Sequence, residues 1–232
     1  MSDNEVRRLN VSFLLAVGGI LFFTGIFSCF TTGIRPLVPG WLFLLLATVP
    51  VELFDLACGV VPALRYAPGI PLWKTLDLNP VKRHDLFPVL PGTAFLYLLL
   101  GLLTGTTVYL LRKINLPVHE QAILGFFRNG SPTEQGILIF STLFLAPAGE
   151  EICFRFAIFR KLAFHVGNVP AAMLTALLFS AAHLNLQVFP ALFLLSLWLT
   201  WLYRRTGSLL APMIAHALFN GITVILLLVH GA

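Results

Sequence analysis

The sequence predicts an all-α, polytopic transmembrane helical bundle of about seven spans, with six or eight as alternatives. Of its 232 residues, 58% are hydrophobic and only 11% are charged, and the mean hydropathy is +0.89. Several windows exceed the roughly 18 apolar residues that mark a spanning helix, and the alternating pattern of a membrane barrel is absent. These observations exclude a soluble domain of ordinary composition and predict a multi-pass integral membrane protein.

Apolar runs and the turn-forming residues between them define the expected spans. The seven spans cover residues 11–33, 41–63, 86–111, 134–164, 170–185, 187–203 and 208–229. The first follows Arg7 and Arg8 but is too long for the apolar region of a signal peptide, so we expect it to remain uncleaved. Residues 115–130 are predicted to form a short helix on the membrane surface.

Basic residues are distributed unevenly over the expected loops. With the N-terminus inside, the cytoplasmic side carries Arg7, Arg8, Arg65, Lys74, Lys82, Arg83, Arg160, Lys161, Arg204 and Arg205, and the outer side carries Arg35, Arg112, Lys113 and Arg128. This bias predicts a cytoplasmic N-terminus in the cell (inner) membrane and an outer C-terminus. Because the net charge of +5 sits mostly in these loops, the predicted partner is the lipid bilayer and not a nucleic acid.

The three cysteines lie inside apolar segments. Neither a CxxC pair nor a zinc-ligand spacing relates Cys29, Cys58 and Cys153. The sequence therefore supports neither a disulfide framework nor a thiolate metal site. Cys153, which lies between the acidic residues and Arg155, is expected to be a small, buried apolar filler.

Ionisable and polar residues inside the expected spans form three clusters, each on a different helix. They are Glu150, Glu151 and Arg155; Phe179 and His183; and His216 and Asn220. An ionisable side chain at bilayer depth costs at least a few kcal/mol unless it faces the interior of the bundle. The clusters therefore predict a polar site inside the protein.

Helical spacing assigns different neighbours to the two glutamates. Glu151 and Arg155 are four residues apart and can form an ion pair, whereas Glu150 points about 100° away. His216 and Asn220, also four apart, present an imidazole and an amide to one point, and Phe179 lies one turn from His183.

The depths of the three clusters allow them to meet. A rise of about 1.5 Å per residue from the cytoplasmic helix ends places Glu150 and His183 at roughly 20 Å, Asn220 at roughly 18 Å and His216 at roughly 12 Å.

Structural roles compete with functional ones at each position. Glu151 and Arg155 can simply neutralise each other and position the helix, and a lone histidine or asparagine often serves helix packing. Glu150 has no second cation on its own helix and is the candidate general base. Glu52 and Asp55, three residues apart in the second span, are expected at a cavity rim or in an ion pair.

Several protease types can be excluded. His119 and Glu120 begin like the HExxH zinc motif, but Ile123 stands at its fifth position. No serine lies in a nucleophile context facing a histidine, and Asp55 is the only aspartate inside the spans. A protease site here must therefore use glutamate and histidine.

The three clusters resemble the EExxxR, FxxxH and HxxxN motifs of the CPBP family (CAAX protease and bacteriocin-processing), which includes CAAX prenyl endopeptidases of the Ras-converting type. The resemblance covers roughly residues 133–230. It implies a catalytic core over residues 132–232 and leaves residues 1–131 as N-terminal helices and loops that are a candidate substrate-selection region.

The resemblance also implies roles for the residues. Glu150 would activate a water molecule with help from His183, and His216 with Asn220 would form the oxyanion hole. Glu151, Arg155 and Phe179 would support the site. Peptide hydrolysis needs such a base and such donors. Metal dependence has also been described for the family, and Glu150, His183 and His216 could bind zinc. We favour a glutamic, metal-free mechanism because the spacing shows no clear ligand triad.

The expected client is a membrane-embedded or lipid-anchored polypeptide cleaved near its C-terminus. It is either a protein with a C-terminal sorting signal, which the depth of the site favours, or a CAAX-like protein. A transporter or channel is an alternative, because intramembrane Glu, Arg and His also mark ion pathways, although no internal repeats are present. A non-catalytic protein of the bacteriocin-immunity type is a further alternative, against which the intact motifs argue.

Overall fold

The computed structural model describes all residues except 1, 28, 30–32, 119–121 and 231–232. No strand occurs in this described part, which confirms the all-α prediction. The principal helices are α1 (Asp3–Leu21), α3 (Gly40–Tyr66), α5 (Arg83–Lys113), α6 (Ala122–Asn129), α7 (Pro132–Phe140), α8 (Ala146–Glu151), α9 (Arg160–Val166), α10 (Asn168–Ala182), α11 (Phe189–Thr206) and α12 (Leu210–His230). Short helical segments are η1 (Phe22–Phe27), η2 (Arg35–Leu37), α4 (Leu72–Thr75), η3 (Ser141–Leu145) and η4 (Ile152–Phe159).

Each of the seven predicted spans corresponds to an apolar helix. Within the described residues, five helices are long and apolar enough to cross a membrane: Asp3–Gly25, Gly40–Tyr66, Arg83–Lys113, Pro132–Val166 and Leu210–Val229. The other two, α10 and α11, are not among these five, so the predicted count of seven spans is not confirmed. At about 22 Å, α10 is shorter than the roughly 30 Å hydrocarbon core.

The first helix and the surface helix have other boundaries in the structure than the sequence predicted. The first helix begins at Asp3 and not at residue 11, because Ser2 and Glu5 form a capping box that starts it earlier. The predicted surface helix over 115–130 is represented by α6, which is shorter. The two residues that resemble the start of an HExxH motif, His119 and Glu120, lie outside the described residues.

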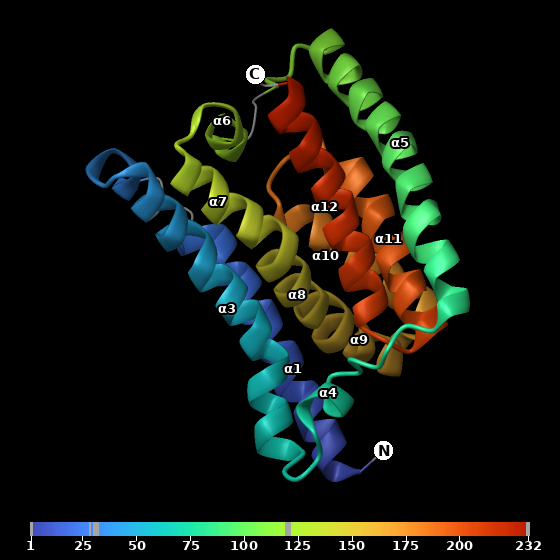
Figure 1. The fold of residues 1–232 in the computed structure, drawn as a ribbon. Coiled ribbons are helices and arrows are strands. Elements are labelled where there is room, and N and C mark those ends of the chain that lie inside the picture. The colour runs from blue at the N-terminus through green and yellow to red at the C-terminus, as the bar shows by residue number, and fades with distance from the viewer. Residues whose placement is uncertain (1, 28, 30–32, 119–121, 231–232) are drawn as a thin grey trace.

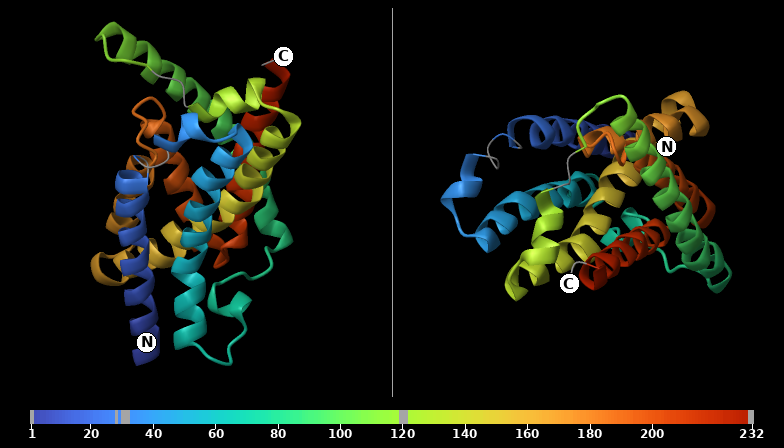
Figure 2. Two further views of the ribbon diagram at one scale, coloured as in Figure 1. Left: turned by 90° about the vertical axis from the view of Figure 1, so that its left-hand side faces the viewer. Right: turned by 90° about the horizontal axis from the view of Figure 1, so that it is seen from above.

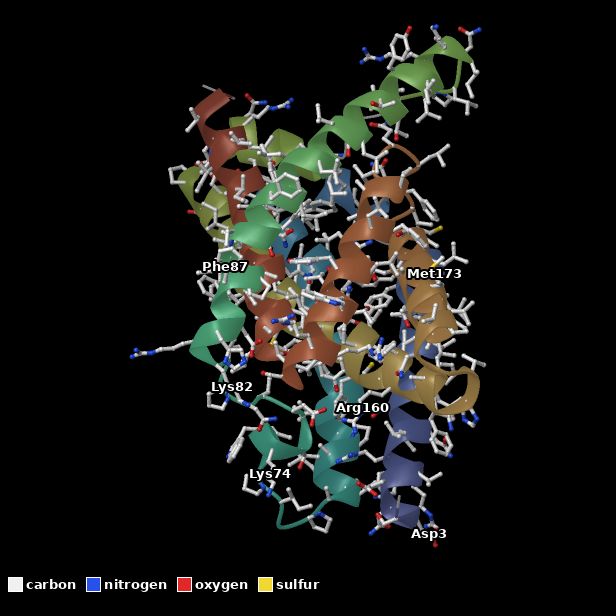
Figure 3. All side chains as sticks on the ribbon, turned by 90° about the vertical axis from the view of Figure 1, so that its right-hand side faces the viewer. Asp3, Lys74, Lys82, Phe87, Arg160 and Met173 are labelled. Atoms are coloured by element: carbon white, nitrogen blue, oxygen red, sulfur yellow. The ribbon has the colours of Figure 1, made fainter. Side chains whose placement is uncertain are left out.

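The helices form one bundle with the termini at opposite ends (Figure 1). Both α3 and α5 lie at the edges of the bundle, with α8 and α12 between them (Figures 1 and 2). The C-terminal end of α5 leans away from the other helices (Figure 3). The η4 segment packs against α1, α3, α10 and α11.

The centre of the bundle is the continuous helix from Pro132 to Val166. All eight residues of η4 are buried, because this stretch is apolar on every side apart from Arg155. The helix changes register twice, through the π-helical segments η3 and η4, and α8 with its two glutamates lies between them. Such π-helical turns are frequent at functional sites.

The first π segment leaves one carbonyl group without a backbone partner. In η3, the Ala146 N–H donates to Ser141 O, five residues back. The next bond in this register would join residue 147 to Thr142 O, but Pro147 has no N–H. The side chain of Asn220 from α12 donates to this carbonyl instead, with an Nδ2–O distance of 3.0 Å. The Asn220 side chain thus supplies the hydrogen bond that Pro147 cannot donate.

An ion pair and two hydrogen bonds around Asp77 hold the loop between α3 and α5 at the N-terminal end of the bundle. The Asp77 carboxylate pairs with Arg160, at an Oδ2–Nη1 distance of 2.8 Å, and accepts a hydrogen bond of 2.7 Å from the Tyr203 hydroxyl. Its carbonyl accepts a bond of 2.9 Å from the Leu209 N–H. One aspartate therefore ties the loop to η4–α9, α11 and α12.

Candidate active site

Glu151 and Arg155 form the predicted ion pair at the centre of the bundle. Both side chains are fully buried, with Arg155 Nε 3.0 Å from Glu151 Oε2 and Arg155 Nη1 3.1 Å from Glu151 Oε1. The other guanidinium nitrogen, Nη2, donates to the Ser196 carbonyl at 3.2 Å and to its hydroxyl at 3.0 Å. A buried arginine needs such partners, and Ser196 is a contributor that the motifs did not indicate.

His216 connects the ion pair to Glu150. Its Nδ1 lies 2.9 Å from Glu151 Oε1, and its Nε2 lies 3.8 Å from Glu150 Oε2. A carboxylate paired with arginine can only accept hydrogen bonds, so the Nδ1 of His216 carries a proton and donates. The sequence predicted a partner for Glu151 in Arg155 alone, and the contact with His216 was missed because it depends on how α12 is rotated and placed.

His183 closes the opposite side of the site. It is the C-terminal cap of α10, and its Nδ1 lies 2.8 Å from the Phe179 carbonyl oxygen. A carbonyl oxygen only accepts, so Nδ1 donates and the Nε2 lone pair is available to another group. The turn at Gly167 joins the helix of Glu150 to α10, and both residues lie about 25 Å along their helices from it, which brings them to the same level.

Phe179 is the apolar centre of the site. Its buried ring contacts Phe154, His183, His216 and the Arg155 guanidinium, at 5.0, 4.8, 6.1 and 4.9 Å respectively. One phenylalanine therefore packs against residues of all three motifs.

Glu150 lies between two cavities. The larger has a volume of about 500 Å³ and is also lined by Glu52, His183, His216 and Asn220. The smaller, about 300 Å³, is lined by Asp55, Glu150 and His183 and by residues of α1. Glu150 Oε2 is shielded from solvent and has no hydrogen-bond partner. The remaining wall of the larger cavity is mostly apolar, and most of its residues come from α5, α6, α11 and α12.

The acidic residues of the second span belong to this site. Glu52 lines the larger cavity and Asp55 the smaller one, as the cavity-rim interpretation expected. Among the residues the structure describes, neither has an ion-pair partner. Gly149 makes their approach possible, since a Cβ atom there would lie 3.0 Å from the Glu52 carbonyl oxygen and 3.1 Å from the Asp55 Cβ.

The side chains implied as zinc ligands do not fit a three-ligand site. The donor atoms of Glu150, His183 and His216 do not all lie within 4.8 Å of one another. His216 Nδ1 and His183 Nδ1 are each engaged by another protein oxygen, so only Nε2 of each ring is free to face a ligand. Across the described part of the chain, the one group of donors that converges is Asp55, Cys58 and Cys153.

Comparisons with known proteins agree with the three motifs. Residues 132–222 match the family model described as "Type II CAAX prenyl endopeptidase Rce1-like", and this match covers every motif residue from Glu150 to Asn220. Searches of curated proteins and of solved structures find no match. Residues 132–222 are therefore similar to the Rce1-like family of type II CAAX prenyl endopeptidases, in agreement with the resemblance that the motifs had indicated.

Proposed function

We propose that this protein is a glutamic intramembrane endopeptidase in which Glu150 is the general base. The observation that supports this role most is the environment of its Oε2 atom, which has no hydrogen-bond partner and lies 3.8 Å from His216 Nε2 at a cavity that His183 also lines. A carboxylate held free of other partners is available to take a proton from a water molecule.

In the proposed reaction, a water molecule binds between Glu150 and His183. Glu150 accepts one water proton while the Nε2 lone pair of His183 accepts a hydrogen bond from the second, which orients the oxygen for attack on the peptide carbonyl carbon. The tetrahedral intermediate then collapses, and Glu150 returns the proton to the leaving amine. Acid–base assistance of this kind contributes typically ~10²–10⁴-fold to the rate.

The oxyanion is stabilised by His216 and Asn220. Because His216 donates from Nδ1 to Glu151, it can also donate from Nε2 only as an imidazolium, and the Glu151 carboxylate is placed to stabilise that cation. Asn220 uses one amide hydrogen on the Thr142 carbonyl and has a second for the oxyanion. Donors already held in position are worth about 3–4 kcal/mol each in comparable sites.

The client is a membrane-anchored polypeptide cleaved near its C-terminus. The family description favours a CAAX-like tail bearing a prenyl group, and the mostly apolar wall of the larger cavity suits a lipid chain or an apolar segment. The mid-helix position of Glu150 suits a C-terminal sorting signal with a spanning helix. Cleavage assays with the two kinds of substrate distinguish between these clients.

The test uses the purified full-length chain in nanodiscs with two fluorescent substrates, a farnesylated CAAX peptide and a peptide with a C-terminal apolar helix and basic tail. We expect cleavage of one of them, with Glu150→Gln and His183→Ala each reducing the rate by at least about 100-fold. Asp3→Asn, which changes an exposed carboxylate far from the site, should cleave normally. Full activity of Glu150→Gln would refute the assignment, and ion-dependent flux without cleavage would favour a transporter.

A further inference from the structure

Beside the candidate active site, three metal-binding side chains converge from two helices. Asp55 and Cys58 lie one turn apart on α3, and Cys153 comes from η4. Their donor atoms all lie within 4.8 Å of one another, and the three residues are only 9%, 0% and 0% exposed. The spacing of the cysteines could not indicate this group, because Cys153 is almost one hundred residues from Cys58 in the sequence and meets it only through packing.

Helix α3 and the central helix each place a carboxylate and a cysteine, three residues apart, where the two helices pack together. Asp55 and Cys58 are separated by three residues, as are Glu150 and Cys153 on the facing helix, so each pair shares a helix face. The Cys153 Sγ lies within 4.8 Å of a carboxylate oxygen of Asp55 and of the Cys58 Sγ. Gly149 permits the close approach, since a side chain there would contact Asp55. The group is therefore a consequence of tight packing between α3 and the central helix.

The charge around this group is not balanced by protein cations. Within the described residues, no lysine or arginine forms an ion pair with Asp55 or Glu52, and Glu52 Oε2 is buried without a hydrogen-bond partner. Glu150 is close enough for its charge to act on both acids. The cysteines lie in an apolar cluster with Ala16, Phe154 and Phe179. A carboxylate in such surroundings is costly unless a cation or a proton compensates it.

We propose that Asp55, Cys58 and Cys153 bind a zinc-class divalent cation. Two thiolates and a carboxylate suit a metal of this softness, whereas Mg²⁺ and Ca²⁺ require oxygen ligands. Metal–ligand distances of about 2.0–2.3 Å place donors around a tetrahedral ion about 3.2–3.8 Å apart. Because the donor atoms already lie within 4.8 Å of one another, they need to approach by no more than about 1.6 Å to form the site. On binding, each thiol releases its proton to solvent.

The cation would link α3 to the helix that carries Glu150, the candidate general base. Cys153 lies one turn from Glu150, so a metal held there would fix the position of α3 against the active site. Asp55 also lines the smaller cavity between α1, α3 and α10, which offers a route for the ion and room for a fourth, water ligand. This site shares no ligand with the Glu150, His183 and His216 set, and its test does not depend on proteolytic activity.

The experiment measures zinc bound to the full-length, detergent-purified chain after equilibrium dialysis against buffered Zn²⁺ under reducing conditions. We expect one zinc per chain in the unaltered protein and in Cys29→Ser, since Cys29 is exposed and is not a member of the group. Cys58→Ser, Cys153→Ser and Asp55→Asn should each weaken binding at least tenfold. Glu150→Gln and His216→Ala, which disable the candidate active site, should retain the metal, so the two proposals can fail separately.

A second measurement requires no substitution in the group. The unaltered chain loaded with Co²⁺ should show the visible absorption of a tetrahedral ion and a thiolate-to-cobalt charge-transfer band, both displaced by Zn²⁺. The proposal is overturned if the reduced chain binds neither ion, if the cobalt spectrum lacks thiolate character, or if Cys58→Ser and Cys153→Ser retain stoichiometric zinc. It is equally overturned if His216→Ala, and not the cysteine variants, releases the metal.

Discussion

Glu150 and Glu151 are adjacent in the sequence but have opposite environments. Glu151 is fully buried and bonded to Arg155 and His216. Glu150 faces two cavities and has other carboxylates, not cations, on the α3 side. Because adjacent helical residues point about 100° apart, one short segment can supply both a structural anion and a reactive one.

This difference predicts separate effects of the two amide variants. Glu151→Gln leaves Arg155 and its partners without a balancing charge in a buried setting, and we expect a loss of about 3–5 kcal/mol in the free energy of unfolding. Glu150→Gln removes a like charge from beside Glu52 and should leave that free energy unchanged or slightly raised. Denaturation by SDS in mixed micelles measures both. Equal destabilisation by the two variants would contradict the division of roles.

At this scale the sequence predicted contacts within a helix and missed contacts between helices. The Glu151–Arg155 pair follows from a spacing of four residues, which any α-helix or nearby register satisfies. The His216–Glu151 contact does not follow, because it depends on the relative height and rotation of two helices. The depth estimate of roughly 12 Å for His216, against roughly 20 Å for Glu150, allowed the clusters to meet but did not indicate which side chains would be in contact.

Among the elements, the central helix owes its shape to a proline and to the asparagine that compensates for it. Pro147 cannot bond to Thr142 O in the π register, and Asn220 donates to that carbonyl. The asparagine therefore has a structural bond in addition to its proposed role toward the oxyanion.

A double-mutant cycle tests this compensation. Asn220→Ala alone leaves a buried carbonyl without a donor, and we expect it to cost about 1–3 kcal/mol. In the Pro147→Ala background the restored N–H can serve the carbonyl, so the same change should cost about 1 kcal/mol less. Unfolding in mixed micelles gives the four values. Strict additivity would show that the proline and the asparagine act independently.

The contact between α3 and α8 depends on the absence of a side chain at Gly149. Gly149→Ala places a Cβ 3.0 Å from the Glu52 carbonyl oxygen, so α3 must move by a few tenths of an ångström. We expect a loss of about 1–3 kcal/mol of stability and a reduced cleavage rate.

Gly136→Ala is the matched control for that contact. Gly136 lies on the same continuous helix, and no other group lies within 4 Å of the position that a Cβ atom would take there. Alanine should therefore be neutral or gain up to about 1 kcal/mol from helix propensity. Equal effects of the two alanines on unfolding and cleavage would argue against a packing role for Gly149.

Element boundaries were predictable where apolar runs determine them, as for α3, α5 and α12. The early start of α1 was not, because its capping box lies outside the apolar run. The end of α10 at Ala182 was also missed. It is followed by Leu184 in a left-handed conformation, with φ of 49°, which no local signal such as glycine announces.

At the scale of the whole molecule, the positions of basic residues can be compared with the predicted membrane topology. Lys74, Lys82 and Arg160 lie toward the same end of the bundle as Asp3 (Figure 3), whereas the C-terminus lies at the opposite end (Figure 1). This grouping matches the loops assigned to one side of the membrane, and the cytoplasmic location of that side stays a prediction.

Cysteine labelling in intact cells tests the orientation. In a Cys29→Ser background the remaining cysteines are buried, and single cysteines at the exposed positions Lys74 and Arg112 report the two ends. A membrane-impermeant maleimide should label Arg112→Cys and leave Lys74→Cys unlabelled until the cells are opened. The reverse pattern would place the N-terminus outside.

The link from Pro147 to Asn220 also bears on how relatives of this protein diverge. Replacing Pro147 by another residue would restore a backbone N–H, so the Thr142 carbonyl would no longer need the Asn220 amide on α12. Loss of the π-helical turn in η3 would remove one residue from the helix before the two glutamates. Proline, π-helical turn and asparagine should therefore be inherited together or lost together. Such correlated change would identify, from alignments alone, which family members build the central helix in this way.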